Sequence, residues 1–321
     1  MLETVTPATL FHTQILDLQQ KFPAVLNGEA EGIHTARVAI RRVRELLPLL
    51  DREPGWASVD DLQSRFKRIG KSLGRVRDAD VRVDLLASLE QRIPHAAPTL
   101  VLVRQRRERE RLVLIRKLIK RLERLDAAQM IGALVRYHPI RFRVFHTVRA
   151  VKWRRELQLI VQQRAQAARE TIAHATGVYF PNRTHSARIA IKRLRYATEI
   201  VHQTGLADRS RAIRALKKAQ DLLGDLHDRQ ELSDHLADEV SRAAAPTDDN
   251  SQVALVRQVI DAEARQLHQR YAERRDRLMV VCCDSLRVGE TRRLPSMVAV
   301  AAVVVSSGVL AARRSRMLRA G

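Results

Sequence analysis

Apolar residues recur every three or four positions along most of this 321-residue chain, and no stretch shows sustained alternation of apolar and polar residues. This spacing is typical of amphipathic helices, whereas alternation would indicate strands. We therefore predict an all-α protein built from two symmetry-related helical bundles of about four helices each. The helices are expected at residues 7–22, 33–50, 59–73, 78–93, 99–125, 126–143, 147–176, from 184 onward, 207–223, 228–242 and 252–286.

Helix ends are predicted from capping residues, prolines and glycines. Thr6 followed by Pro7 is a typical helix start, because the threonine side chain accepts a hydrogen bond from an unpaired backbone N–H. Pro23 is expected to end the first helix, since proline has no N–H to donate. Gly74 is expected to stop the third helix, with Asp78 as the N-cap of the next one.

One sequence unit occurs twice. Residues 33–44 (IHTARVAIRRVR) return 151 residues later as 184–195 (THSARIAIKRLR), and residues 73–78 (LGRVRD) return 150 residues later as 223–228 (LGDLHD). Two motifs repeated at nearly the same separation indicate an internal duplication. We therefore divide the chain into a first half at residues 1–146, a second half at residues 147–290, and a basic and apolar tail at residues 291–321.

Each copy of the longer motif has a basic face and an apolar face if it is helical. At about 100° per residue, its four cations fall within an arc of roughly 80°, and apolar residues fill the opposite side. The basic positions are His34, Arg37, Arg41 and Arg44 in the first copy and His185, Arg188, Lys192 and Arg195 in the second. For one such helix, ordinary surface ion pairs are the simpler interpretation. Because the face is repeated and has few acids at the arc positions, we expect a binding site where the two faces meet.

The charge balance sets the class of ligand. Lys and Arg outnumber Asp and Glu by 58 to 36, a net charge of +22. Such a field attracts polyanions and repels cations, so nucleic acid, an acidic membrane surface or another polyanion is the expected ligand. The Arg–Glu mixture at residues 104–111 is expected to be a solvated face with internal ion pairs. Only Cys282 and Cys283 are cysteines, and residues 1–21 lack a secretory pattern. We therefore expect no disulfide framework and a cytoplasmic protein.

The repeated pattern His-x-x-Arg-Val/Ile-Ala-x-Arg/Lys-Arg-x-Arg, followed about 40 residues later by Leu-Gly-x-x-x-Asp, resembles the CHAD domain, the conserved histidine α-helical domain. The resemblance covers roughly residues 7–286. It implies two four-helix bundles that form a basic cavity or pore in which inorganic polyphosphate binds. The domain often accompanies CYTH-type triphosphate tunnel metalloenzymes, and here such a partner is expected to be a separate chain.

The resemblance also assigns residues, position by position. It implies polyphosphate binding by His34, Arg37, Arg41, Arg42, Arg44, His185, Arg188, Lys192, Arg193 and Arg195, and less specifically by Lys67, Lys71, Lys217 and Lys218. Tyr196 also matches the family's second-half pattern, whereas Glu45 stands at the corresponding place in the first half.

Polyphosphate binding also agrees with the residues themselves. Polyphosphate is a flexible string of like charges without bases, so a matching site needs many fixed cationic donors and little else. We predict a binding module rather than an enzyme, which targets or scaffolds at polyphosphate granules. Polyphosphate-metabolising proteins are candidate partners, and no cofactor, metal or catalytic residue is expected.

Two alternative functions stay open. Non-specific nucleic-acid binding is one, because a net charge of +22 attracts phosphate backbones. Aromatic residues are few for base stacking, at 4%. A metal-dependent phosphohydrolase is the other, suggested by His227-Asp228. The first copy has Arg77-Asp78 at that place, which favours a helix-capping or arginine-orienting role for the repeated aspartate.

The tail contains a run of 17 uncharged, mostly apolar residues at 296–312, flanked by arginines. This run falls short of the ~20 residues that a membrane-spanning helix needs. We therefore expect a helix packed on the bundle or a disordered tail rather than a membrane anchor.

Overall fold

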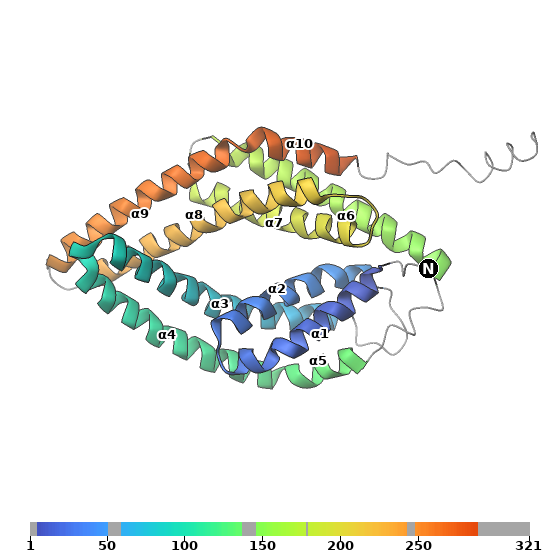
Figure 1. The fold of residues 1–321 in the computed structure, drawn as a ribbon, viewed down its shortest axis with the longest axis horizontal. Helices are drawn as coiled ribbons and strands as arrows, with labels where there is room; N and C mark the ends of the chain where they lie inside the picture. Colours follow the sequence, from blue (N-terminus) through green and yellow to red (C-terminus); the bar gives the residue numbers. More distant parts are fainter. Residues whose placement is uncertain (1–4, 51–58, 137–145, 178, 243–247, 288–321) are drawn as a thin grey trace, which may run out of the picture. The chain divides into compact units, whose positions relative to one another are not determined.

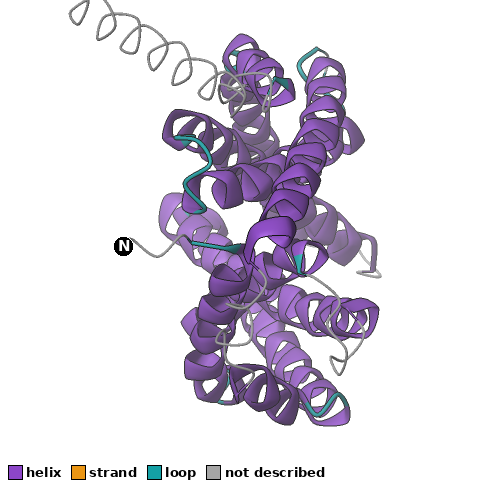
Figure 2. Cartoon of the chain, turned by 90° about the vertical axis from the view of Figure 1, so that its right-hand side faces the viewer, coloured by secondary structure: helices purple, strands orange, loops and turns teal. Residues whose placement is uncertain are grey.

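Helices form the regular secondary structure in the described part of the chain (Figure 2). The computed structural model describes residues 5–50, 59–136, 146–177, 179–242 and 248–287. No strand occurs among these residues, so the predicted all-α fold is confirmed. The helices are α1 (Pro7–Leu26), α2 (Ala30–Leu46), η1 (Leu47–Leu49), α3 (Val59–Arg92), η2 (Pro94–Ala96), α4 (Ala97–Arg124), α5 (Ala127–Arg136), α6 (His146–Ala175), α7 (Pro181–Gln203), α8 (Ser210–Arg242), α9 (Asp248–Ala272) and α10 (Arg275–Leu286).

The helices pack in two groups with the same order of neighbours (Figure 1). In the first group, α1 packs against α2 and α5, α2 against α3, and α3 against α4. In the second group, α6 packs against α7 and α10, α7 against α8, and α8 against α9. Each group therefore has four longer helices and a short fifth one, and the repeated motif forms α2 in one group and α7 in the other.

Both groups belong to one compact unit, Met1–Leu286. The predicted tail at residues 291–321, including the apolar run at 296–312, lies outside the described residues. Among the helices that the structure describes, none has both the length and the apolar character needed to cross a membrane.

Two long helices run through glycines that the sequence predicts as helix ends. Helix α3 continues through Gly74 and Asp78, and α8 continues through Gly224 and Asp228. The predicted breaks, and the N-cap role of Asp78, are therefore wrong. A glycine inside a helix costs about 1 kcal/mol relative to alanine, and tertiary packing along a long helix outweighs that cost. The opposite error occurs near the C-terminus, where the single helix predicted at 252–286 is two helices, α9 and α10.

Helix α1 starts as predicted but ends later. The Thr6 hydroxyl accepts a hydrogen bond from the Thr9 N–H at 3.2 Å, which confirms the cap. Pro23 lies inside α1 rather than ending it, so that prediction is wrong. The following helix begins very close to α1, since a Cβ added at Gly32 would lie 2.5 Å from the Cβ of Ala24. Glycine at this position allows the close approach of the two backbones.

An apolar core joins the tips of α3 and α4 to those of α8 and α9, at the left of Figure 1. We call this set of buried residues the joint core: Leu86, Leu89, Ile93, Ala96, Leu100, Val103, Leu232, Leu236, Val253, Val256 and Ile260. Polar contacts border it, both between the two groups and within the second group. Arg92 and Arg229 both donate to Glu263, and Thr99 donates to Gln252 at 2.9 Å. The joint core therefore fastens the first half of the chain to the second.

The mixed-charge stretch of α4 contains the expected internal ion pairs. Arg104 bonds Glu108 at 2.6 Å, and Arg107 bonds Glu110 at 2.8 Å. Arg104 also bonds Glu90 of α3, at 2.6 Å. Arg107 is only 8% exposed, so the prediction of a solvated face is wrong at this position. Arg104 and Arg107 are therefore engaged by acids within the protein.

Candidate functional site

Helices α2 and α7 present the repeated motif with one buried side and one basic side. The buried apolar residues are Ile33, Ala36, Ala39, Ile40 and Val43 in α2 and Ala187, Ala190, Ile191 and Leu194 in α7. Their removal from water holds each helix against its group. The histidines, arginines and lysine between them stay partly or fully exposed. The predicted separation into an apolar and a basic face is therefore confirmed.

Cations of both motif copies gather where α2 and α7 meet. Arg37 and Arg41 of α2, together with Arg188 of α7, are near enough to Lys192 to lower its pKa. Arg195 of α7 likewise acts on the pKa of Arg41. We call these five residues the basic cluster. The structure thus brings together predicted site residues that are about 150 positions apart in the sequence.

Tyr196 lies next to two guanidinium groups of the basic cluster. The Cζ atoms of Arg195 and Arg41 lie 4.7 and 5.8 Å from the centre of its ring. An aromatic face attracts cations, so this ring of α7 also holds an arginine of α2. Tyr196 is 3% exposed, which means that it positions the arginines from the protein interior. Glu45, at the equivalent place in α2, forms an ion pair with Arg164 of α6 at 2.5 Å.

Burial and like charges make the basic cluster unfavourable when it is empty. They lower the pKa of Lys192 from 10.5 to about 8, with burial as the largest cause and Arg188, Arg41 and Arg37 next. Burial also lowers the pKa of Arg41, whose Nε has no hydrogen-bond partner in the described part of the chain. A buried donor without a partner costs about 1–3 kcal/mol. The cluster therefore has positive charge and donors in excess, and an anion can compensate both.

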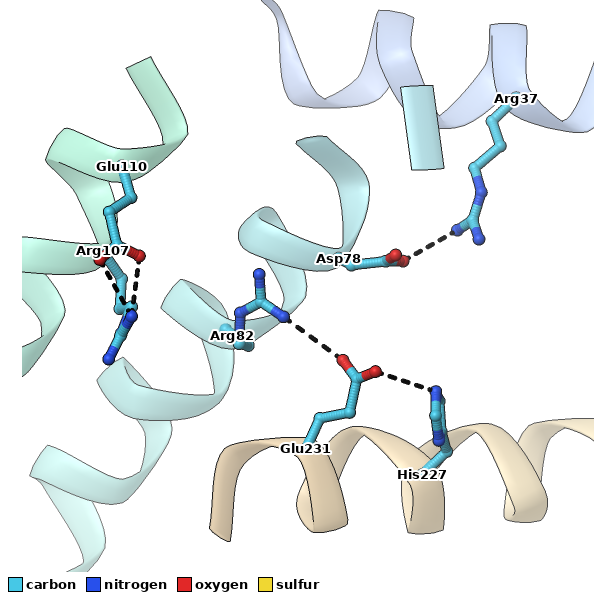
Figure 3. A network of polar contacts seen from close by, with 7 residues as sticks. All are labelled: Arg37, Asp78, Arg82, Arg107, Glu110, His227 and Glu231. Carbon is cyan, nitrogen blue, oxygen red and sulfur yellow. Dashed lines mark hydrogen bonds and ion pairs between the residues drawn. The ribbon is translucent and has the colours of Figure 1, made fainter. Parts of the chain in front are cut away.

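Acids nevertheless engage two members of the cluster. Asp78 of α3 forms an ion pair with Arg37 at 3.5 Å (Figure 3). Arg195 donates to Gln220 at 3.0 Å and to Glu199 at 2.7 Å. The expectation that acids are scarce around the basic face is therefore wrong for these two arginines, because the acids stand on another helix or one turn beyond the motif. Asp78 orients an arginine, which is one of the two roles expected of the repeated aspartate.

The two motif histidines lie beside further basic groups. Burial, followed by the charge of Arg77, lowers the pKa of His34 below its ordinary value. The rings of His185 and His227 are 4.9 Å apart between centroids, and burial followed by His227 lowers the pKa of His185. Both motif imidazoles are therefore mainly neutral at pH 7 and add positive charge only at lower pH.

A polar network links His227 to the first half of the chain (Figure 3). The Nε2 atom of His227 lies 3.4 Å from one carboxylate oxygen of Glu231, and the other oxygen lies 3.3 Å from Arg82 of α3. Sequence reasoning missed Arg82 and Glu231. The available signal is their spacing, since each stands one helical turn after a motif residue, Asp78 or His227.

His227 lies beside a carboxylate, and Asp228 lies near the charge of an arginine. Within the described residues, no group of three or more His, Cys, Asp or Glu side chains is arranged to hold a metal ion. His227 pairs with Glu231 as described above. Burial raises the pKa of Asp228, and the charge of Arg188 opposes that rise. Asp228 and Arg188 stand at the positions that correspond to Asp78 and Arg37 in the first half, and the charge of Arg188 acts on Asp228.

Other predicted site residues are not members of the basic cluster, although the charge of Arg193 also contributes to the lowered pKa of Lys192. Those that are exposed are Arg193 on α7, Lys67 and Lys71 on α3, and Lys217 and Lys218 on α8. Arg42 lines a separate pocket together with Gln14, Glu45 and Tyr196. Arg44 keeps its Nε buried without a hydrogen-bond partner among the described residues. The part that these residues play in binding therefore stays a prediction.

The fold and the basic cluster define an all-α protein in which two helix groups share a cationic site. A family model described as the CHAD domain matches residues 9–237. The chain therefore belongs to the CHAD domain family, as its repeated motifs indicate.

Two solved structures share this architecture. The CHAD domain from the plant Ricinus communis matches with a TM-score of 0.57 and 22% sequence identity, over 89% of this chain and 91% of that chain. PptA from Streptomyces chartreusis matches with a TM-score of 0.56 and 14% identity, over 87% of this chain and 98% of that chain. At these identities the likeness shows the fold alone. No curated protein matches the chain.

Proposed function

We propose that this chain binds inorganic polyphosphate through the basic cluster. The supporting observation is the meeting of cations from α2 and α7 around the half-buried Lys192. Arg41 adds a buried donor that has no partner in the described part of the chain. A site of this kind is unfavourable when empty and gains both charge neutralisation and hydrogen bonds when an anion enters.

The chemistry of the cluster fits a phosphate chain. Guanidinium groups offer planar pairs of donors to phosphate oxygens, and a lysine adds a compact charge. Each motif is also long. From His34 to Arg44, ten residues along a helix extend about 15 Å, and the second motif has the same length. A chain of several phosphates can follow both motifs, whereas a single phosphate contacts only a few cations.

The proposed role is binding rather than catalysis. The protein would use the cluster to attach to polyphosphate, including granules in the cytoplasm, and would bring other proteins to it as a targeting or scaffolding module. Polyphosphate-metabolising or CYTH-type proteins on separate chains are the partners in this proposal. Nucleic acid is expected to bind only through the general positive charge.

A titration with polyphosphates of defined length tests the proposal. We expect triphosphate to bind poorly and affinity to rise by about a hundredfold or more until the ligand contacts both motifs, because the second contact is then intramolecular. Two double variants, Arg37→Gln with Arg41→Gln and Arg188→Gln with Lys192→Gln, should each weaken the binding of long polyphosphates far more than that of short ones. The exposed pair Arg116→Gln with Lys117→Gln, on α4, is the matched control. Affinity that does not depend on length would contradict one shared site.

The alternative ligand is examined with the same protein. Labelled long polyphosphate bound to the chain is challenged with DNA and RNA of equal total charge at raised salt. Binding that depends only on net charge weakens in parallel for all three polymers as salt rises. We expect polyphosphate to stay bound at salt concentrations that release both nucleic acids. Equal displacement by nucleic acid would favour the non-specific nucleic-acid function instead.

A further inference from the structure

Lys192 occupies an unusual place for a lysine side chain. It lies on α7 one turn after Arg188 and one turn before Tyr196, and it is half-buried. The guanidinium of Arg41 approaches the Tyr196 ring from α2, so a cation of the opposite helix lies beside this turn of α7. The exposed Lys217 and Lys218 on α8 provide internal references, because they belong to the same chain but lie on the solvent side of their helix.

These surroundings favour the reactive form of the amine. Neighbouring cations and burial disfavour the ammonium ion, and an amine in such a place is an activated nucleophile. The same two causes give Lys192 its pKa of about 8, against an ordinary 10.5. At pH 8 about half of the Lys192 side chains are therefore neutral, whereas well under a hundredth of ordinary lysines are.

We propose that Lys192 is a site of acylation by acyl phosphates, the mixed anhydrides of a carboxylic acid and phosphoric acid. The inference rests on the proposed function, because the arginines expected to bind polyphosphate would hold the phosphate group of the acyl donor. Arg188 on the same helix and Arg41 on the facing helix, whose charges both act on Lys192, are the candidates for that contact.

The proposed reaction is a nucleophilic substitution at the acyl carbon. The lone pair of the Lys192 Nζ attacks the carbonyl carbon of the acyl phosphate, and the bond from that carbon to the phosphate oxygen breaks. Inorganic phosphate leaves with the electron pair of the broken bond, and the nitrogen loses a proton to water. The product is a neutral amide at Lys192. Acylation therefore removes one positive charge from the basic cluster and lowers its attraction for a polyanion.

Site-resolved mass spectrometry on the intact protein tests the inference. The protein is treated with acetyl phosphate at pH 8, and the initial rate of acetylation is measured at every lysine. We expect Lys192 to react about tenfold faster than Lys217 and Lys218. With a neutral acetylating ester the preference should be smaller, because that reagent carries no phosphate for the arginines. A rate at Lys192 no greater than at Lys217, or equal preference with both reagents, would overturn the proposal.

Substitution of Arg41 and a separate binding measurement distinguish this inference from the proposed function. Arg41→Gln should slow acetylation of Lys192 severalfold without changing Lys217, whereas Arg116→Gln on α4 should change neither. An unchanged rate at Lys192 in Arg41→Gln overturns the inference. Polyphosphate titration of the unmodified protein reports on the proposed function separately. Selective acetylation without polyphosphate binding would leave the inference standing alone, and polyphosphate binding with an unreactive Lys192 would leave the proposed function alone.

Discussion

The joint core and the basic cluster both connect the first half of the chain to the second, but with opposite chemistry. The joint core consists of buried apolar residues, and the charges at its border are paired, since Arg92 and Arg229 share Glu263. The basic cluster brings like charges together, lowers the pKa of Lys192 and leaves the Arg41 Nε without a hydrogen-bond partner among the described residues. The joint core favours the folded protein, whereas the like charges of the basic cluster disfavour it.

The difference indicates that the joint core supplies stability and that the basic cluster depends on it. Charges of one sign repel each other, so cations on two helices would not stay close without another source of stability. The joint core can supply that stability because burial of apolar side chains is the dominant favourable term in folding. We infer that the joint core fixes the approach of α3 to α8, and that α2 and α7 are thereby kept near each other.

The largest effect is expected from damage to the joint core. The substitution Leu89→Ala should lower the free energy of unfolding of the protein by about 2–5 kcal/mol. The Leu89 side chain is fully buried, so the substitution removes apolar contacts and leaves a cavity. Urea unfolding followed by circular dichroism measures this. Leu102→Ala on α4, at 62% exposed, is the control and should change stability by less than about 0.5 kcal/mol. Equal costs for the two variants would show that the joint core does not carry the stability.

The second effect concerns binding. Reversal of charge at Arg37, Arg41 and Arg44 together should weaken the binding of long polyphosphate by about a hundredfold or more, since it replaces two arginines of the basic cluster and a third arginine of the same motif by repelling carboxylates. The control reverses Arg116, Lys117 and Lys120, three exposed cations of α4, and changes the net charge by the same amount. Calorimetric titration of both variants, after a check of helix content, compares them. Equal losses would mean that total charge, rather than the basic cluster, binds the ligand.

The helical faces of the site could be predicted from the sequence because they depend on the spacing within one segment. The helical spacing of apolar and basic positions placed Ile40 on the buried face and Arg37 on the basic face, and the structure confirms both. The repeat likewise predicted that α2 and α7 occupy equivalent places. Such features follow from local chain geometry, so a single sequence is sufficient to find them.

Features that depend on contacts between distant segments could not be predicted. Asp78 lies opposite Arg37 only because α3 continues through Gly74, and local propensity suggested that the helix would stop there. The joint core is equally invisible in the sequence, since Leu89 and Ile260 have no local signal that they meet. Tertiary packing decided these points, and helix propensity is a weak guide where packing is extensive.

A smaller effect, on stability without ligand, is expected at Lys192. Lys192→Met should raise the unfolding free energy at pH 7 by ~1–2 kcal/mol, since it removes a charge that burial and Arg188 disfavour. The same variant should bind polyphosphate more weakly. Lys117→Met, at an exposed position of α4, is the control and should change neither quantity appreciably. A loss of stability in Lys192→Met would contradict the view that the empty cluster is unfavourable.

The pH dependence of stability gives an independent reading of the same residue. In the folded protein the pKa of Lys192 is about 8, whereas in the unfolded chain it is near the ordinary 10.5. Between these values the unfolded state binds more protons, so the contribution of Lys192 to stability rises as the pH rises from about 8 to 10.5. Urea unfolding across this window should show that rise in the unsubstituted protein and lose it in Lys192→Met.

The smallest effect is expected from the motif histidines, which lie at the margin of the basic cluster. His34 and His185 have a lowered pKa in the free protein, so they are mainly neutral at pH 7. A bound polyanion attracts a proton to each ring and raises its pKa, so the complex binds more protons than the free protein does. Polyphosphate affinity should therefore rise as the pH falls below about 6.5 and level off once the free histidines are also charged. We expect a gain of about fivefold between pH 7.5 and pH 5.5.

Substitution of both histidines shows whether that gain comes from the site. In the double variant His34→Gln with His185→Gln, the affinity should be nearly constant over the same range, because glutamine keeps a donor but cannot gain a charge. His174→Gln, at an exposed position of α6, should retain the full pH dependence. The His227 ring lies beside His185 and contacts Glu231, so a residual slope that disappears in His227→Gln would extend the site toward Arg82 and the joint core. An undiminished slope in the double variant would instead place both motif histidines outside the ligand's reach, and the arginines alone would define the boundary of the basic cluster.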